Sequence, residues 1–234
     1  MIDPGRIIVA LDFSKKEDAL RIVGELEGLV NFYKIGLELF ISEGPSIISL
    51  IKAKNKKIFL DLKLHDIPET VYKATKSALR YGIDMLTVHT TGGIDMMRRS
   101  AEALKEISLK ENNQTKILGV TVLTSHDKKS LESLFNHSFD PETLACNLAL
   151  KAKQAGLDGV IASGHEVRKI KEICGKNFMV VTPGIRLKKD EKNDQRRTVT
   201  PNEAFSSGAD YIVIGRSLTQ ASSPKDKFIE MFKN

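Results

Sequence analysis

A group of charged residues stands at the end of an apolar run in residues 58–70, Ile-Phe-Leu-Asp-Leu-Lys-Leu-His-Asp-Ile-Pro-Glu-Thr. Asp61 and Lys63 are two residues apart, so on a β-strand their side chains point to the same face. Asp66 follows three residues later, just before Pro68, a residue typical of the first turn of a helix. Because unpaired buried charge is costly, charges gathered at the end of a buried strand indicate a functional site.

The surroundings of Lys63 narrow the chemistry that this site can perform. A lysine that forms an imine with its substrate must lose its proton, which an apolar or cationic environment promotes. Here Asp61 and Asp66 flank Lys63, and nearby carboxylates favour the ammonium form. Lys63 is therefore predicted to be a fixed cation and proton donor. This disfavours an imine-forming aldolase and favours a site that stabilises and protonates a carbanion.

Eight short apolar runs alternate with segments of helical spacing along the chain. The expected strands cover residues 7–11, 32–35, 57–63, 85–89, 117–123, 159–162, 178–182 and 211–214. The expected helices cover residues 15–27 (capped by Ser14), 46–54, 68–81, 93–109, 128–135, 141–156, 166–174, 201–208 and 224–232. Such alternation is typical of parallel β-α-β units. Eight units predict a single (β/α)8 TIM barrel of the α/β class, with an open doubly wound sheet as the alternative.

Composition restricts the class of protein further. No linker rich in Gly, Ser or Pro interrupts the 234 residues, so residues 1–234 are expected to form one catalytic domain. No apolar run reaches the length of about 18 residues that a membrane span needs, and the first residues lack the features of a secretory signal. Cys146 and Cys174 form no Cys-x-x-Cys pair, which fits a reducing, cytoplasmic location. The net charge of +6 favours anionic partners, and its scattered distribution favours a solvated basic surface over a nucleic-acid interface.

The carboxyl ends of the strands form the active-site face of a TIM barrel. The residues expected at those ends are Asp12, Lys34, Asp61, Lys63, His89, Thr124, Ser163, Pro183, Gly215 and Arg216. The first four are charged and should lie close together, either as a structural ion-pair cluster or as a catalytic group. They come from three different strands and share one rim of the barrel, which favours a catalytic group over a structural ion-pair cluster. His89 is expected to be a hydrogen-bonded rim residue rather than a base.

Two adjacent loops have the composition of a phosphate site. Pro183-Gly-Ile-Arg186 and Gly215-Arg216 follow the seventh and eighth strands, where TIM barrels often bind phosphate. Glycine lets the backbone approach an anion, and arginine can hold it with two hydrogen bonds. Residues 184–198 are long for a barrel loop and are predicted to form a lid rather than a solvated excursion. The five histidines lack the spacing of a zinc site, so no metal is expected.

The sequence closely resembles the orotidine 5'-phosphate decarboxylase family of the bacterial type over essentially its full length. The most specific match is the run from Asp61 to Thr70. The other matching segments are Val9–Asp12, Lys34–Gly36, Val88-His89, Gly92-Gly93, Val122–Ser125, Pro183–Arg186, Asp194-Gln195, Thr200-Pro201, Gly208–Asp210 and Val213–Arg216. Asp-x-Lys-x-x-Asp alone marks a wider group of phosphate-binding barrels. Its combination with Ile-Pro-x-Thr, the lid glutamine and the terminal Ile-Gly-Arg is much more specific.

This resemblance implies removal of the C6 carboxylate of orotidine 5'-phosphate to give uridine 5'-phosphate (UMP) and carbon dioxide. That reaction is the last step of de novo pyrimidine biosynthesis, and the family uses no metal or organic cofactor. By similarity, Lys63 protonates C6, Asp61 lies against the departing carboxylate, and Lys34 and Asp66 complete an alternating charged array. The resemblance also implies that Asp12 and Lys34 bind the ribose and that Thr124 contacts the pyrimidine. Gln195 is implied to bridge base and phosphate, Arg216 and the Gly215 backbone to bind the phosphate, and Pro183 and Arg186 to line the mouth of the site.

The resemblance further implies a homodimer, in which Asp66 and Thr70 of each chain enter the site of the neighbouring chain.

Thr90-Thr91 departs from the family pattern, which has smaller residues there, and is expected to add bulk at the rim. Two other functions stay open. One is a sugar-phosphate decarboxylase or hexulose-phosphate synthase that uses a magnesium enediolate, which Gln195 and the Ile-Pro-x-Thr run disfavour. The other is a catalytically silent nucleotide- or RNA-binding barrel, whose only support is the charge of +6.

Overall fold

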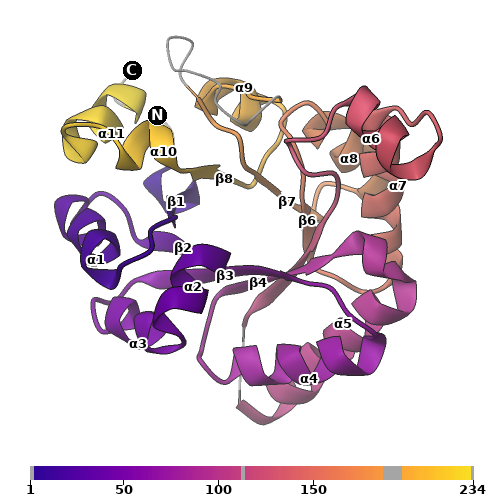
Figure 1. Ribbon diagram of the computed structural model, residues 1–234, viewed down its shortest axis with the longest axis horizontal. Coiled ribbons are helices and arrows are strands. Elements are labelled where there is room, and N and C mark those ends of the chain that lie inside the picture. The colour runs from indigo at the N-terminus through magenta and orange to yellow at the C-terminus, as the bar shows by residue number, and fades with distance from the viewer. Residues whose placement is uncertain (1–2, 112–113, 187–196, 233–234) are drawn as a thin grey trace.

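Eight parallel strands close into one barrel in the computed structural model, which describes residues 3–111, 114–186 and 197–232 (Figure 1). The strands are β1 (Ile7–Leu11), β2 (Phe32–Gly36), β3 (Lys57–Leu64), β4 (Met85–His89), β5 (Lys116–Val120), β6 (Gly159–Ile161), β7 (Met179–Thr182) and β8 (Tyr211–Ile214). Each strand pairs with the next one in the sequence, and β1 pairs with β8, which closes the sheet. The predicted TIM barrel is therefore confirmed, and the open doubly wound alternative is wrong. Gln195 and most of the predicted lid lie outside the described residues.

Helices surround the barrel on its outer side (Figure 1). They are α1 (Lys16–Glu25), α2 (Leu37–Glu43), α3 (Ser46–Lys52), α4 (Pro68–Leu79), α5 (Gly93–Glu111), α6 (Lys128–Phe135), α7 (Pro141–Gln154), α8 (Val167–Cys174), α9 (Pro201–Ser206), α10 (Arg216–Thr219) and α11 (Pro224–Phe232), with 3₁₀ turns at Pro4–Arg6 and Thr90–Gly92. The sequence did not predict α2 and α10, because each is short and begins without a side-chain cap. The expected cap at Ser14 is wrong: Lys15 holds that position and makes no side-chain capping bond.

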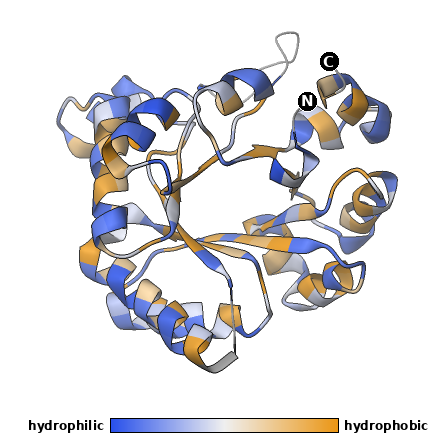
Figure 2. Ribbon diagram, turned by 180° about the vertical axis from the view of Figure 1, so that it is seen from behind, coloured by the Kyte–Doolittle hydropathy of each residue, from blue (hydrophilic) through white to orange (hydrophobic). Residues whose placement is uncertain are grey.

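Alternation along the strands separates two apolar cores. Outward-facing strand residues pack against the helices, and inward-facing ones fill the barrel. Figure 2 shows hydrophobic strands at the centre and helices that carry both hydrophobic and hydrophilic residues. The interior cluster consists of Ile8, Ala10, Phe32, Phe59, Met85, Leu118, Val181 and Val213. Two residues further along β2, β3 and β4 come Lys34, Asp61 and Thr87, all buried. The interior thus changes from apolar to polar toward the carboxyl ends of these strands.

The pairing of β3 with β4 is irregular at the point where the charges begin. Leu60 pairs with Leu86, but the next pair in register is Leu64 with Val88. Three residues of β3 therefore lie opposite one residue of β4, which is the geometry of a β-bulge. Among the described helices, none is long and apolar enough to cross a membrane.

Candidate active site

A cavity of about 270 Å³ lies at the carboxyl ends of the strands. The predicted site residues that line it are Asp12, Lys34, Asp61, Lys63, Thr124, Pro183, Arg186, Gly215 and Arg216, together with Ser163. The rim residue His89 does not line it. Asp66 and Thr70 do not line it either, and both are exposed, one just before α4 and the other in its first turn. The structure thus brings together the expected residues of seven strand ends, all but that of β4, and leaves Asp66 and Thr70 open to solvent.

Four of these residues form a chain of alternating charge across the cavity floor. The Lys34 ammonium lies 2.8 Å from Oδ1 of Asp12 and 3.7 Å from Oδ2 of Asp61. The same Oδ2 lies 2.8 Å from Nζ of Lys63. Lys34 and Asp61 are nearly buried, whereas 49% of the Asp12 side chain is exposed. The predicted proximity of the four charges is confirmed.

The electrostatics of the cavity favour an anionic ligand. Burial opposes ionisation of Asp61, but Lys34 and Lys63, together with a hydrogen bond from Thr87, bring the pKa of its carboxyl below the usual value. The cavity-lining residues include four cations, Lys34, Lys63, Arg186 and Arg216, against the two carboxylates Asp12 and Asp61. Part of the wall is apolar, from Val120, Val122, Ile161, Ala162 and Val213. In the described part of the chain, no group of three or more His, Cys, Asp or Glu is arranged to hold a metal ion.

Gly36 leaves the space in which the Lys34–Asp12 pair lies. A Cβ atom at this position would stand 2.9 Å from Nζ of Lys34 and 3.0 Å from Oδ1 of Asp12. The backbone of Gly36 is extended, with φ of −92°, a conformation that any residue can adopt. Glycine is therefore needed here for space and not for its conformational freedom.

His89 is held beside the cavity by its neighbours. Its Nδ1 accepts a hydrogen bond from the Thr91 N–H, and its ring stacks on His65 with centroids 5.3 Å apart. Burial, and then the charges of His65, Lys63 and His126, lower the pKa of His89 to about 4. The prediction of a hydrogen-bonded residue is confirmed. The expected extra bulk at the rim is wrong for Thr90, which is buried and donates to the Val120 carbonyl at 2.7 Å.

Sequence reasoning missed two groups near the site. Thr87, in β4, hydrogen-bonds both Asp61 and the Lys63 backbone. Because side chains alternate along a strand, Thr87 lies on the same face of β4 as His89, two residues later, and this spacing could have identified it. Glu166 and Arg197 form a buried ion pair, and Arg197 also donates to the Val122 and Leu123 carbonyls, next to the cavity. No local pattern identifies this pair, because its members are 31 residues apart.

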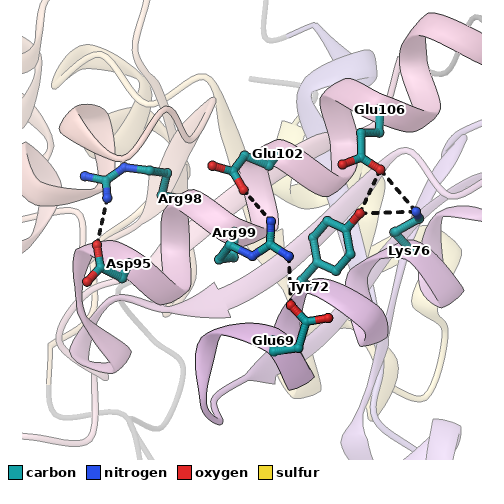
Figure 3. Close-up of polar contacts among 8 residues, drawn as sticks. All are labelled: Glu69, Tyr72, Lys76, Asp95, Arg98, Arg99, Glu102 and Glu106. Carbon is teal, nitrogen blue, oxygen red and sulfur yellow. Dashed lines mark hydrogen bonds and ion pairs between the residues drawn. The ribbon is translucent and has the colours of Figure 1, made fainter.

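Helix α4 is fixed against α5 by a polar cluster (Figure 3). The Arg99 guanidinium lies 3.9 Å from the centre of the Tyr72 ring and pairs with Glu69 and Glu102 at 2.7 and 2.6 Å. Oε2 of Glu106 accepts from the Tyr72 hydroxyl at 2.7 Å and from Lys76 at 3.1 Å. These contacts hold the first turn of α4, which carries Thr70, in a fixed position at the surface.

Comparison with known proteins agrees with this architecture and cavity. A family model described as orotidine 5'-phosphate decarboxylase / HUMPS matches residues 5–230. Proteins named orotidine 5'-phosphate decarboxylase from Carboxydothermus hydrogenoformans and from a Nostoc species are 47% and 42% identical to this chain. They cover 96% and 94% of it, over 95% and 92% of their own lengths. The crystal structure of orotidine 5'-phosphate decarboxylase from Lactobacillus acidophilus superposes with a TM-score of 0.85 at 37% identity, covering 98% of each chain. The chain belongs to the orotidine 5'-phosphate decarboxylase / HUMPS family.

Proposed function

We propose that this protein decarboxylates orotidine 5'-phosphate to UMP and carbon dioxide, as the last step of de novo pyrimidine biosynthesis. The observation that carries the proposal is the pairing of Lys63 with Asp61 in one cavity with Arg186 and Arg216. This cavity offers fixed cations at two places, as a substrate with both a phosphate and a carboxylate requires. The names of the relatives at 42–47% identity support the same reaction.

Binding in this proposal begins with the phosphate. Arg216 and the Gly215 backbone receive the phosphate, with Arg186 and Pro183 at the mouth and Gln195 bridging phosphate and base. Asp12 and Lys34, which already form an ion pair, take the ribose hydroxyls. Thr124 contacts the pyrimidine, whose flat ring suits the apolar wall around Val122 and Ile161. Phosphate binding is remote from the bond that breaks, so its free energy can be used to hold the reacting groups in place.

The chemical step follows from the charges on the cavity floor. The bond between C6 and the carboxylate carbon breaks, carbon dioxide leaves, and the electron pair stays on C6. The Lys63 ammonium stabilises this carbanion and then donates a proton to it, which completes UMP, and Lys63 regains a proton from water. Asp61 lies against the departing carboxylate and keeps Lys63 in the ammonium form. The reaction needs no metal or organic cofactor, since the carbanion is stabilised by the lysine alone.

The proposal includes a homodimer in which Asp66 and Thr70 enter the partner's site. Both residues are exposed and lie outside the cavity of their own chain, and the α4–α5 cluster holds their segment in place. Asp66 would then extend the alternating chain of Lys34, Asp61 and Lys63. We further propose that residues 1–234 act as one catalytic domain in the cytoplasm.

The decisive experiment follows the loss of orotidine 5'-phosphate absorbance with the purified protein in the presence of a metal chelator. We expect full turnover. Absence of this turnover, together with magnesium-dependent turnover of a sugar phosphate, would favour the sugar-phosphate alternative. Absence of turnover by the pure protein, together with binding of UMP or RNA, would favour a silent binding barrel.

A further inference from the structure

Thr87 lies in the middle of β4, opposite the bulge of β3, and its side chain is fully buried. Its Oγ1 makes two hydrogen bonds of 2.9 Å, one from the backbone N–H of Lys63 and one to Oδ1 of Asp61. The amide can only donate, so the hydroxyl accepts there and uses its own proton for the carboxylate. One hydroxyl therefore joins the backbone of the proposed proton donor to the carboxylate that pairs with it.

The Lys63 N–H needs this acceptor because the strand pairing is broken here. Three residues of β3 lie opposite Thr87 alone, so the backbone amide of Lys63 is out of register with β4. Lys63 also has a φ of 50°, in the left-handed region that is unfavourable for a residue with a Cβ atom. A partly buried N–H that has lost its strand partner still needs an acceptor, and the Thr87 hydroxyl supplies it. This bond stabilises the backbone conformation from which the Lys63 side chain enters the cavity.

The second bond fixes the orientation of the Asp61 carboxylate. Oδ1 accepts from Thr87, while Oδ2 faces Lys63 at 2.8 Å and Lys34 at 3.7 Å. The two oxygens thus have different partners, and rotation of the carboxylate would break the bond to Thr87. Lys34 of β2 is shared with Asp12, which follows β1. Thr87 is itself not among the residues that line the cavity.

We propose that Thr87 is a positioning residue for catalysis, which holds the Lys63 backbone and the Asp61 carboxylate in their reactive arrangement through a single hydroxyl. The inference rests on the proposed decarboxylation. It goes beyond that function because it assigns a role to a buried side chain that does not touch the substrate.

Two pairs of variants test the hydroxyl alone. Thr87 and Thr87→Val differ in the hydroxyl at nearly constant volume, as do Thr87→Ser and Thr87→Ala. We expect kcat to fall about 10- to 100-fold in each variant without the hydroxyl, because a hydrogen bond to a charged group is lost. The affinity for UMP should change little, since the phosphate loops are untouched, and Thr87→Ser should stay near the wild-type kcat. Thr75→Val is the matched control, because Thr75 is also fully buried and its hydroxyl bonds Ser100 at 2.9 Å, between α4 and α5.

A second measurement does not depend on turnover. The carboxyl carbon of Asp61 can be titrated by nuclear magnetic resonance in protein labelled with ¹³C-aspartate. Loss of the Thr87 hydroxyl should raise the pKa of Asp61, because one of the groups that lower it is removed while Lys34, Lys63 and Asp12 remain. Thr75→Val should leave the titration unchanged.

The outcomes are distinct. Equal kcat within both pairs, or an unchanged Asp61 titration in Thr87→Val and Thr87→Ala, overturns the role of Thr87 even if the wild type is a decarboxylase. If the wild type does not turn over orotidine 5'-phosphate, the proposed function fails and the catalytic role of Thr87 fails with it. The titration then shows only whether the hydroxyl orients the carboxylate. If Thr87→Val does not fold, the Ser and Ala pair decides.

Discussion

Lys63 carries its charge from an unusual backbone position. Its φ of 50° costs a lysine about 1–3 kcal/mol, so the surrounding structure must hold it there. The bulge in β3 and the hydrogen bond to Thr87 do so, and the side chain then reaches Asp61 at 2.8 Å. Strain of this kind, at a cavity lined by charges, supports a catalytic role for the residue.

Replacement of Lys63 tests that role. We expect Lys63→Ala to lower kcat by about 10²- to 10⁴-fold, because the proposed proton donor is lost. Binding of UMP should survive, since the arginine loops remain. The measurements are kcat and the UMP affinity, with Lys16→Ala on the exposed face of α1 as the control. Turnover by Lys63→Ala at the wild-type rate would reject Lys63 as the donor.

Replacement of Gly36 is expected to lower the activity of the protein without lowering its stability. The methyl group of Gly36→Ala would displace the flexible ends of Lys34 and Asp12, not the backbone. We therefore expect kcat/KM to fall about 10- to 100-fold through the disturbed ion pair, with little change in the free energy of unfolding.

The matched control for Gly36 is Gly24→Ala, at an exposed position of α1 where an added Cβ meets nothing within 4 Å. That variant should be about 0.5–1 kcal/mol more stable and fully active. A stable Gly36→Ala enzyme with normal kcat/KM would show that the space over Gly36 is not needed.

At the scale of elements, the Glu166–Arg197 pair joins three loops at the carboxyl end of the barrel. Glu166 precedes α8, Arg197 precedes α9, and Arg197 donates to the Val122 and Leu123 carbonyls after β5 at 3.1 and 3.3 Å. Val199, close by, packs over Gly164, where a Cβ atom would stand 2.4 Å from it. The pair therefore links these three loops directly.

This pair should give stability a measurable dependence on pH. Burial, against the pull of Arg197, raises the pKa of Glu166 from 4.5 to about 7. Between these values the folded protein binds the proton more tightly than the unfolded chain does, so this carboxyl's contribution to stability falls as the pH rises through 7. In urea unfolding, the free energy of unfolding of Glu166→Gln should increase relative to that of the wild type as the pH rises from 5 to 8. The increase should reach at most about 1.4 kcal/mol per pH unit. Glu38→Gln, at an exposed position of α2, is the control, and a difference that does not vary with pH would contradict the prediction.

At the scale of the whole molecule, one chain carries an incomplete version of the proposed site. Asp66 and Thr70 come shortly after β3 but are exposed, outside the cavity that Asp61 and Lys63 line. A homodimer would resolve this, because a two-fold axis lets each chain supply the segment that the other lacks. On this proposal the isolated monomer is nearly inactive.

Mixed dimers test the shared site. Lys63→Ala and Asp66→Ala should each be inactive alone. After subunit exchange, a hybrid dimer has one site with both defects and one site with none. Random exchange should therefore restore about one quarter of the wild-type activity. Exchange can be verified by mass spectrometry of isotope-labelled chains. Confirmed exchange without any recovered activity would mean that Asp66 does not act in the partner's site.

Much of the fold follows from local pattern. The strands β1, β4 and β8 and the helices α6 and α11 have the bounds that the apolar spacing predicts, and the others differ by a few residues at their ends. Helix α10 was missed because four residues are too few to show a periodic apolar face, and α2 because Gly36 gives no start signal comparable to Pro45 before α3. The charged residues of the site were found because each stands at the end of an apolar run, where an unpaired charge would be costly.

The sequence by itself therefore determined the barrel, the family and the charged residues that line the cavity. These depend on residue type and on spacing within single elements, which the chain carries locally. Only the tertiary structure decided that Thr87 links Lys63 to Asp61, that Gly36 leaves room for the Lys34–Asp12 pair, and that Glu166 meets Arg197. It also decided that Asp66 lies outside the cavity of its own chain. Each of these depends on the distance between atoms that strand register and barrel closure bring together, and no spacing along the sequence encodes such a distance.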